Sequence, residues 1–165
     1  MKEERYFYVP NADRTNELPP EETTHALRVL RLQSGDDMFL MDGRGNFYHA
    51  EVSLATHKKC LYHIKETLPQ EKTWRGHIHL AIAPTKHIDR IEWLAEKATE
   101  VGFDEITFLH CAFSERKALR TDRIEKIVIS AAKQSRKPWI PVVNELESFK
   151  TFIQQPREGR KFIAH

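Results

Sequence analysis

The sequence is poor in cysteine and has no long apolar run. Its 165 residues contain only two cysteines, Cys60 and Cys111, too far apart for a C-x-x-C motif. This excludes a disulfide framework and argues against a structural zinc site. The longest apolar run is a few residues, whereas a membrane-spanning helix needs about 20. The N-terminus is too short and too acidic for a secretory signal. We therefore predict a cytoplasmic protein with free thiols.

Familiar catalytic and phosphate-binding motifs are also missing. The sequence has no phosphate-binding glycine-rich loop, no G-x-S-x-G elbow and no H-E-x-x-H motif. His77 and His79 would face the same side of a strand, but no third ligand follows at a suitable spacing, so we predict no metal site. Glu92, Glu96 and Glu100 would form one stripe on a helix, and such stripes are usually solvated rather than catalytic.

The net charge of +2 hides an asymmetry between the two halves of the chain. Residues 1–70 carry 9 basic and 11 acidic side chains, and residues 71–165 carry 17 basic and 13 acidic ones. Eight bases and three acids fall within residues 114–137 alone. Such a segment can face phosphates, and it can equally be a solvated helix surface, which charge alone favours.

The hydrophobic pattern changes in rhythm near Pro69. Residues 1–70 show short apolar runs, a hairpin turn at Asp42–Asn46, and one amphipathic helix from Glu21 to Leu32. From residue 74 onward strands and helices alternate, which predicts a parallel sheet with helices on its faces. Gly102 should end the first helix of this half. A third strand is expected at 139–143 and a fourth, the last, at 161–164. We predict two domains, 1–70 and 74–165, in an α/β protein with an N-terminal β domain.

Two short basic segments are candidate binding sites. His25, Arg28 and Arg31 are spaced three apart and should share the polar face of the first helix, where arginines suit RNA phosphates or base edges. They could instead pair with nearby aspartates. Arg116 follows a strand, at the carboxyl edge where function tends to lie. It could bind phosphate, or Glu115 could neutralise it.

Several segments, in order along nearly the whole chain, resemble the RsmE family of RNA methyltransferases. Residues 25–32 (HALRVLRL), followed by Gly35-Asp36 and Asp42-Gly43, resemble the PUA-like domain of that family. Residues 92–102 (EWLAEKATEVG) and 114–116 (SER) resemble its second domain. So does the stretch AAKQSR at 131–136. Any one match would be weak, but together they are specific.

The resemblance implies a PUA-like β-barrel followed by the α/β part of a SPOUT methyltransferase domain, whose C-terminal segment forms a trefoil knot. It implies a homodimer that uses S-adenosylmethionine (SAM) to methylate N3 of a uridine in the 16S rRNA of the small ribosomal subunit. Arg116 is our candidate for stabilising the uracil anion, and the base stays unidentified. The predicted RNA-binding residues are Arg28, Arg31, Arg116, Lys117, Arg120, Lys133 and Arg136.

The sequence departs from the family at its end. The Gly-Pro-Glu-Gly-Gly loop and the later Arg-Leu-Arg-Glu-Thr-like stretch, which hold the methyl donor in the family, have no counterpart before His165. We therefore expect the cofactor site to lie beyond His165, and we expect this chain by itself to be inactive and to bind no SAM. The alternative is a non-catalytic RNA-binding module.

Overall fold

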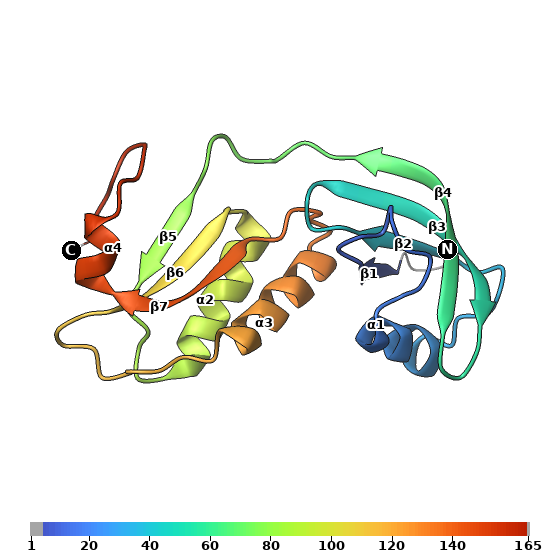
Figure 1. Ribbon diagram of the computed structural model, residues 1–165, viewed down its shortest axis with the longest axis horizontal. Helices are drawn as coiled ribbons and strands as arrows, with labels where there is room; N and C mark the ends of the chain where they lie inside the picture. The colour runs from blue at the N-terminus through green and yellow to red at the C-terminus, as the bar shows by residue number, and fades with distance from the viewer. Residues whose placement is uncertain (1–4, 165) are drawn as a thin grey trace.

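The computed structural model describes residues 5–164, which form two lobes placed side by side along the longest axis of the molecule (Figure 1). The N-terminal lobe comprises residues 5–69 and the C-terminal lobe residues 79–164. Residues 70–78 run between them as a single segment without helix or strand. None of the helices in the described part of the chain is long and apolar enough to cross a membrane.

The N-terminal lobe is built on a four-stranded sheet in the order β1-β2-β3-β4. β1 (Tyr6–Tyr8) runs parallel to β2 (Asp37–Met41). β3 (Asn46–Ala55) and β4 (Cys60–Pro69) continue the sheet in antiparallel fashion. Side chains alternate along β3, so Ala50 and Val52 are buried while Glu51 between them is half-buried.

The predicted helix of this lobe is shorter than expected. Its first turns are α1 (Pro20–Thr24), which continue directly into the wider π-helical turns of η1 (His25–Val29). Arg31 has a positive φ of 54° and therefore lies outside the helix that we predicted to reach Leu32. Ala26 packs into the core of the lobe, whereas Val29 is exposed.

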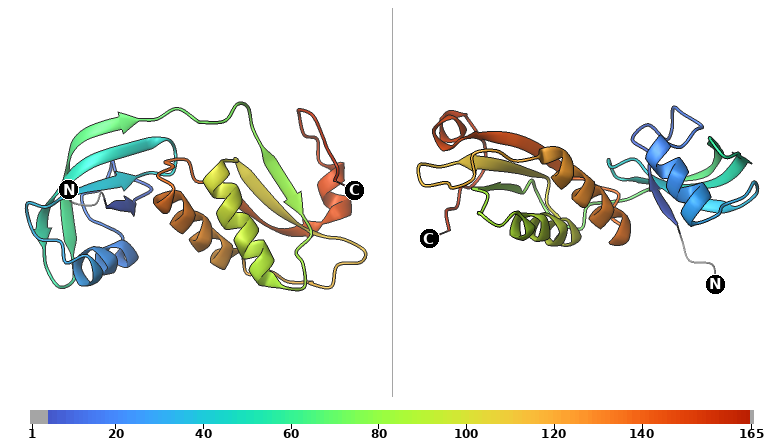
Figure 2. Two further views of the ribbon diagram at one scale, coloured as in Figure 1. Left: turned by 180° about the vertical axis from the view of Figure 1, so that it is seen from behind. Right: turned by 90° about the horizontal axis from the view of Figure 1, so that it is seen from below.

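The C-terminal lobe is a parallel three-stranded sheet in the order β5-β6-β7, covered on one face by two helices (Figure 2). Its elements in chain order are β5 (His79–Ile82), α2 (Ile88–Val101), β6 (Glu105–His110), α3 (Thr121–Gln134), β7 (Val142–Ser148) and α4 (Phe149–Gln154). Ile91, Ile106, Phe108 and Val128 form the core between the helices and the sheet. The predicted α/β class with a parallel second sheet is confirmed.

Two local predictions for this lobe are wrong. The third strand was predicted at 139–143 but begins at Val142, because Trp139 and Ile140 pack against the other lobe instead. Residues 161–164, predicted as a fourth strand, form no regular element, and Phe162 and Ile163 are exposed. Strand-like composition alone does not form a strand where no neighbouring backbone supplies hydrogen bonds.

The hairpin turn between β2 and β3 joins the lobes. Asp42 closes the turn by accepting hydrogen bonds from the backbone N–H groups of Arg44 (2.7 Å) and Asn46 (3.1 Å). The turn then pairs with the segment before β7, because the Gly45 N–H donates to the Pro138 carbonyl (3.0 Å) and the Ile140 N–H donates to the Gly43 carbonyl (3.0 Å). A small apolar cluster that includes Met41, Phe47 and Ala132 lies beneath this junction.

The connecting segment is itself fixed. The Asp104 carboxylate accepts hydrogen bonds from Lys72, from the Trp74 indole (3.0 Å) and from the Ile78 N–H (2.7 Å). Burial alone would raise the pKa of Asp104, but these three hydrogen bonds outweigh it and hold the pKa below its ordinary value of 3.8. The Lys72 ammonium also lies 5.0 Å from the centre of the Trp139 ring. Residues 70–78 are therefore held to the C-terminal lobe.

We expect Gly45→Ala to destabilise the protein more than Gly35→Ala. Both glycines have positive φ (106° and 91°), so both substitutions strain the backbone. A Cβ at residue 45 would lie only 2.2 Å from the Trp139 ring, whereas a Cβ at residue 35 would meet nothing within 4 Å. The difference in the free energy of unfolding should be about 1–3 kcal/mol, the usual cost of overpacking. Equal losses in chemical denaturation would show that the Trp139 contact is dispensable.

Candidate nucleic-acid interface

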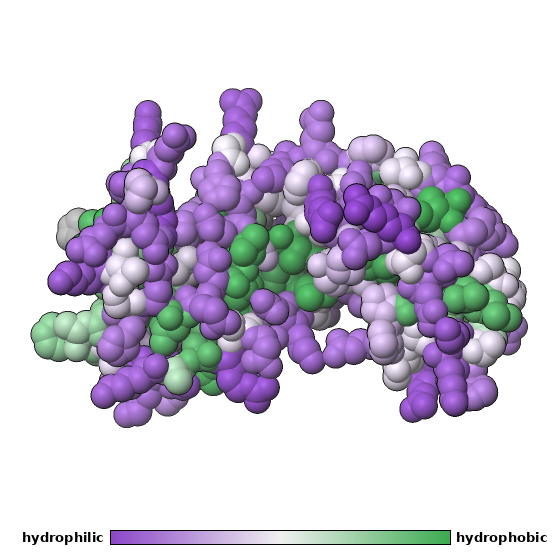
Figure 3. All heavy atoms as spheres, in the orientation of Figure 1, coloured by the Kyte–Doolittle hydropathy of each residue, from purple (hydrophilic) through white to green (hydrophobic). Residues whose placement is uncertain are grey.

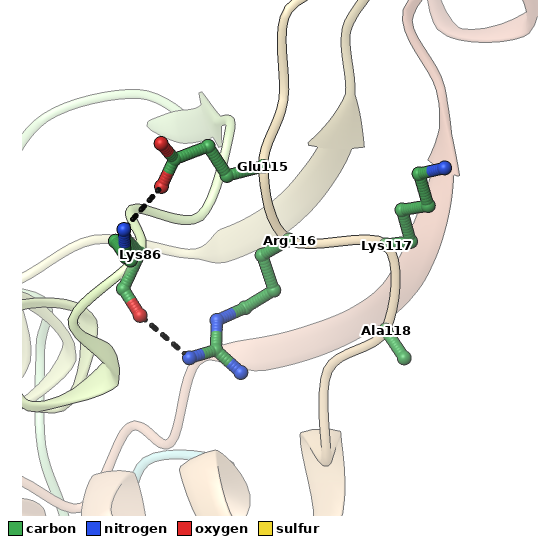
Figure 4. Close-up of a pocket in the computed structure, with 5 residues that line it drawn as sticks. All are labelled: Lys86, Glu115, Arg116, Lys117 and Ala118. Atoms are coloured by element: carbon green, nitrogen blue, oxygen red, sulfur yellow. Dashed lines mark hydrogen bonds and ion pairs between the residues drawn. The ribbon is translucent and has the colours of Figure 1, made fainter.

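An open recess lies at the carboxyl edge of the second sheet, between the loop after β5 and the loop after β6 (Figure 4). Its volume is about 570 Å³, and it is lined by Lys86, Glu115, Arg116, Lys117 and Ala118. Because β5 and β6 are parallel, the loops that follow them meet at the same edge. The segment 114–117 therefore lies where the sequence predicted. Lys86 was not predicted, although the same rule points to the loop that carries it.

The Arg116 side chain is held in place by the loop after β5. Its Nε donates to the Thr85 carbonyl (3.2 Å) and its Nη2 to the Lys86 carbonyl (2.7 Å). Glu115 pairs with the Lys86 ammonium (3.9 Å) rather than with Arg116, so the alternative in which Glu115 neutralises Arg116 is wrong. Arg116 thus presents a fixed positive charge at the recess, and the Lys117 side chain points away from the Arg116 side chain (Figure 4).

The recess does not fit SAM. Three cations and one carboxylate line it, which is the wrong balance of charge for a sulfonium cation. A cofactor of that size also needs a pocket that encloses most of its surface against apolar walls, whereas this recess is open and four of its five lining residues are charged. Anionic groups such as RNA phosphates suit it better.

Arg28 and Arg31 are exposed on the N-terminal lobe. Asp37 is occupied by His49 (3.0 Å) and Lys65 (2.8 Å), and Asp42 closes the hairpin turn. Among the residues that the structure describes, neither guanidinium has a hydrogen-bond or ion-pair partner. The alternative, in which these arginines pair with nearby aspartates, is therefore not seen among the described residues.

Most of the basic side chains in α3 and next to its two ends already have partners within the protein. Arg120 binds Asp122 (2.8 Å), Arg123 binds Glu92 (2.7 Å), and the Arg136 guanidinium lies 5.6 Å from the centre of the Tyr6 ring. The helix therefore presents much less unpaired positive charge than the sequence suggests.

Lys133 and Lys126 make ion pairs to the other lobe. Lys133 contacts both carboxylate oxygens of Glu22 (2.6 and 2.8 Å), and both side chains are largely buried. Lys126 reaches Glu21 (3.2 Å), where both side chains are exposed. Lys133 thus joins the two lobes through its ion pair with Glu22, and it is not part of the RNA-binding surface that we propose.

The two groups of candidate residues are not brought together within one chain. The N-terminal lobe lies at one end of the long axis and the loop after β6 at the other, in each of the three views (Figures 1 and 2). Arg28 and Arg31 are therefore separated from Arg116 and Lys117 by the length of the C-terminal lobe, with Arg136 at the junction between them.

The residues considered as metal ligands have protein partners. His77 and His79 both contact Glu105 (2.8 and 3.1 Å), and burial keeps the pKa of His79 below its ordinary value even though that carboxylate raises it. On α2, Lys97 bridges Glu96 and Glu100 at 2.8 Å each. No group of three or more candidate metal ligands occurs among residues 5–164.

A β domain joined through one turn to a parallel α/β sheet, with a cationic recess at the carboxyl edge of that sheet, suits a two-domain protein that binds RNA. Family models agree: residues 18–64 match an RNA methyltransferase PUA domain, and residues 72–165 match an RNA methyltransferase domain. The second match covers more than half of the chain. The chain therefore belongs to this RNA methyltransferase family, and the resemblance to RsmE proteins is confirmed.

Two curated relatives carry the name Ribosomal RNA small subunit methyltransferase E. The protein of Synechocystis is 30% identical over 78% of this chain, and that of Bacillus subtilis is 25% identical over 98% of it. The match spans 42% of the Synechocystis protein and 67% of the Bacillus protein.

Solved structures share the fold. A probable rRNA-methyltransferase from Porphyromonas gingivalis is 41% identical with a TM-score of 0.85, covering 92% of this chain and 64% of that one. A methyltransferase from Legionella pneumophila, in complex with the bound cofactor SAM, is 25% identical with a TM-score of 0.88. That match covers 99% of this chain and 71% of the Legionella one.

We expect Lys133→Ala to lower stability far more than Lys126→Ala, its matched control on the same helix. Removing Lys133 leaves the largely buried Glu22 carboxylate without its partner, which costs about 3–5 kcal/mol in comparable pairs. Removing Lys126 breaks an exposed pair worth about 0–1 kcal/mol. Urea denaturation gives both values. If Lys133→Ala instead keeps full stability and lowers only the affinity for RNA, Lys133 is a phosphate contact as the sequence predicted.

Proposed function

We propose that this chain forms the RNA-recognising part of a SAM-dependent methyltransferase that modifies N3 of a uridine in 16S rRNA. The observation that carries the proposal is the fixed Arg116 at the carboxyl edge of the methyltransferase sheet, in a chain that matches both domains of the family in order. The names of the curated relatives support the choice of substrate.

In this proposal Arg116 acts on the uracil ring. Uridine N3 carries a proton at neutral pH, so negative charge develops on O2 and O4 as the proton leaves. Two backbone carbonyls hold the Arg116 guanidinium before the substrate arrives, so it needs no reorganisation to stabilise that charge. The residues described here include no identified base for N3, and we assign none.

In this proposal the two lobes contact different parts of the RNA. Arg28 and Arg31 hold the RNA backbone, while Arg116 and Lys117 contact RNA near the target nucleotide, with Arg120 and Arg136 as further contacts. Because the two groups lie at opposite ends of one chain, a homodimer would place the PUA-like lobe of one copy near the recess of the other. The small ribosomal subunit in the cytoplasm is the corresponding partner.

A second candidate is an RNA-binding module without catalysis. It needs the same cationic residues at the recess, and an anion-binding recess of this kind serves RNA binding without any chemistry. The two candidates separate on methylation: the module binds 16S rRNA but transfers no methyl group, even when the protein is translated from the full reading frame.

We expect Arg28→Ala and Arg31→Ala to weaken binding of 16S rRNA fragments without unfolding the N-terminal lobe. Each lost phosphate contact should reduce the slope of log affinity against log salt concentration by about one unit. Arg14→Ala is the charge-matched control, because Arg14 is an exposed arginine of the same lobe. Filter binding across a salt series is the measurement. Normal binding combined with a lower melting temperature would assign both arginines a structural role.

We expect Arg116→Ala to reduce kcat for methylation by roughly 10²–10³-fold, the usual effect of removing one stabilising donor. RNA affinity should change much less, because the role of Arg116 is in the transition state. Lys117→Ala is the matched control and should weaken RNA binding while kcat stays unchanged. The assay uses the protein from the full reading frame with 16S rRNA. If Arg116→Ala instead loses as much RNA affinity as Lys117→Ala and keeps its kcat, Arg116 is only a phosphate contact.

A further inference from the structure

The tip of the loop after β6 carries a phenylalanine that the protein leaves in solvent. Phe113 is 99% exposed, more than any other large apolar side chain in the described part of the chain. Apolar atoms project over this loop at the far end of the molecule in the space-filling view (Figure 3). The proposed function assigns no role to this side chain.

The loop holds its tip in a defined shape. The Ser114 N–H donates to the Cys111 carbonyl (3.0 Å), and the Cys111 N–H donates to the Ser114 hydroxyl (2.9 Å). These two hydrogen bonds close a turn of which Phe113 forms the outer corner. The two bonds from Arg116 to the loop after β5 then fix the side of the loop that follows. Phe113 is therefore presented from an anchored turn.

The charges around this ring indicate what it binds. Lys86, Arg116 and Lys117 line the recess that begins just after the tip, and Glu115 is its one acidic residue. A cationic surface beside a flat aromatic ring is complementary to a polyanion that also carries flat rings, since phosphates bind the cations and a base stacks on the aromatic side chain. An apolar protein partner would use the ring but not the cations.

We propose that Phe113 is a stacking platform for an unpaired RNA base, next to the phosphate-binding recess. The proposal rests on the RNA-binding function proposed above and adds the class of RNA. A base can stack on Phe113 only when it is not stacked within a helix, so the site selects single-stranded or flipped-out nucleotides over duplex RNA.

The test uses the 165-residue chain and two probes: a single-stranded RNA of about ten nucleotides, within the usual site size, and a duplex of the same sequence. Phe113→Ala should weaken binding of the single strand about tenfold, in the range found for single base–aromatic stacks. Binding of the duplex should not change. The salt dependence should keep its slope, because no cation is lost.

Replacing Phe113 by another aromatic residue or by an aliphatic one distinguishes base stacking from simple apolar contact. Phe113→Trp should retain the affinity, and Phe113→Leu, which is apolar but has no π face, should bind as weakly as Phe113→Ala. Phe162→Ala is the matched control because Phe162 is also exposed, at 88%, and it should bind RNA normally.

The possible failures are distinguishable. If the wild-type chain binds neither probe, the proposed RNA-binding function fails and the stacking role fails with it. If the wild type binds and the Phe113 variants bind equally well, only the stacking role fails. A Phe113→Ala variant that changes the sedimentation coefficient of the free protein would identify Phe113 as a contact to a second copy, which also overturns the proposal.

Discussion

The indole of Trp139 lies directly against the backbone of the Asp42–Asn46 turn, and the relative placement of the two lobes depends on this contact. It is possible only because residue 45 is a glycine, since a Cβ there would meet the ring. The same turn exchanges backbone hydrogen bonds with Pro138 and Ile140. The Lys72 ammonium lies over the same indole ring, so the connecting segment shares in the contact. The two sheets are thereby joined through one turn rather than through a large shared core.

The repeating features of the sequence predicted much of the fold. The alternation of strand and helix after Pro69 gave the parallel sheet, and Gly102 ends α2 as expected because its φ of 117° suits glycine. The position of Arg116 at a strand's carboxyl edge followed from the same rule. These predictions succeeded because they rest on local periodicity and on the geometry of parallel sheets. The domain boundary at 70–74 stays a prediction, although residues 70–74 form neither helix nor strand.

Contacts between distant parts of the chain could not be predicted from the sequence. Lys133 was expected to face RNA, but it pairs with Glu22, which is 111 residues away. The number of charged residues in a segment does not indicate which of them form ion pairs in the folded protein. In the same way, Trp139 fitted the pattern of a strand, and only the glycine of the opposite lobe explains why it leaves the sheet. The fourth strand failed for a related reason, because a strand needs a neighbour that the sequence pattern does not supply.

The fixed connection between the lobes has a thermodynamic consequence for any ligand that touches both. Several attachments hold the lobes and the linker in place, among them the Gly45–Trp139 contact, the Glu22–Lys133 ion pair and the Asp104 cluster. The chain therefore loses the freedom of the lobes to move relative to each other when it folds. Binding of a ligand to both lobes does not add this entropy cost. Rigid presentation of this kind raises affinity without any new contact, because less freedom remains to be lost. Loosening the junction should therefore weaken binding of a ligand that spans the lobes even when every residue that touches the ligand is unchanged.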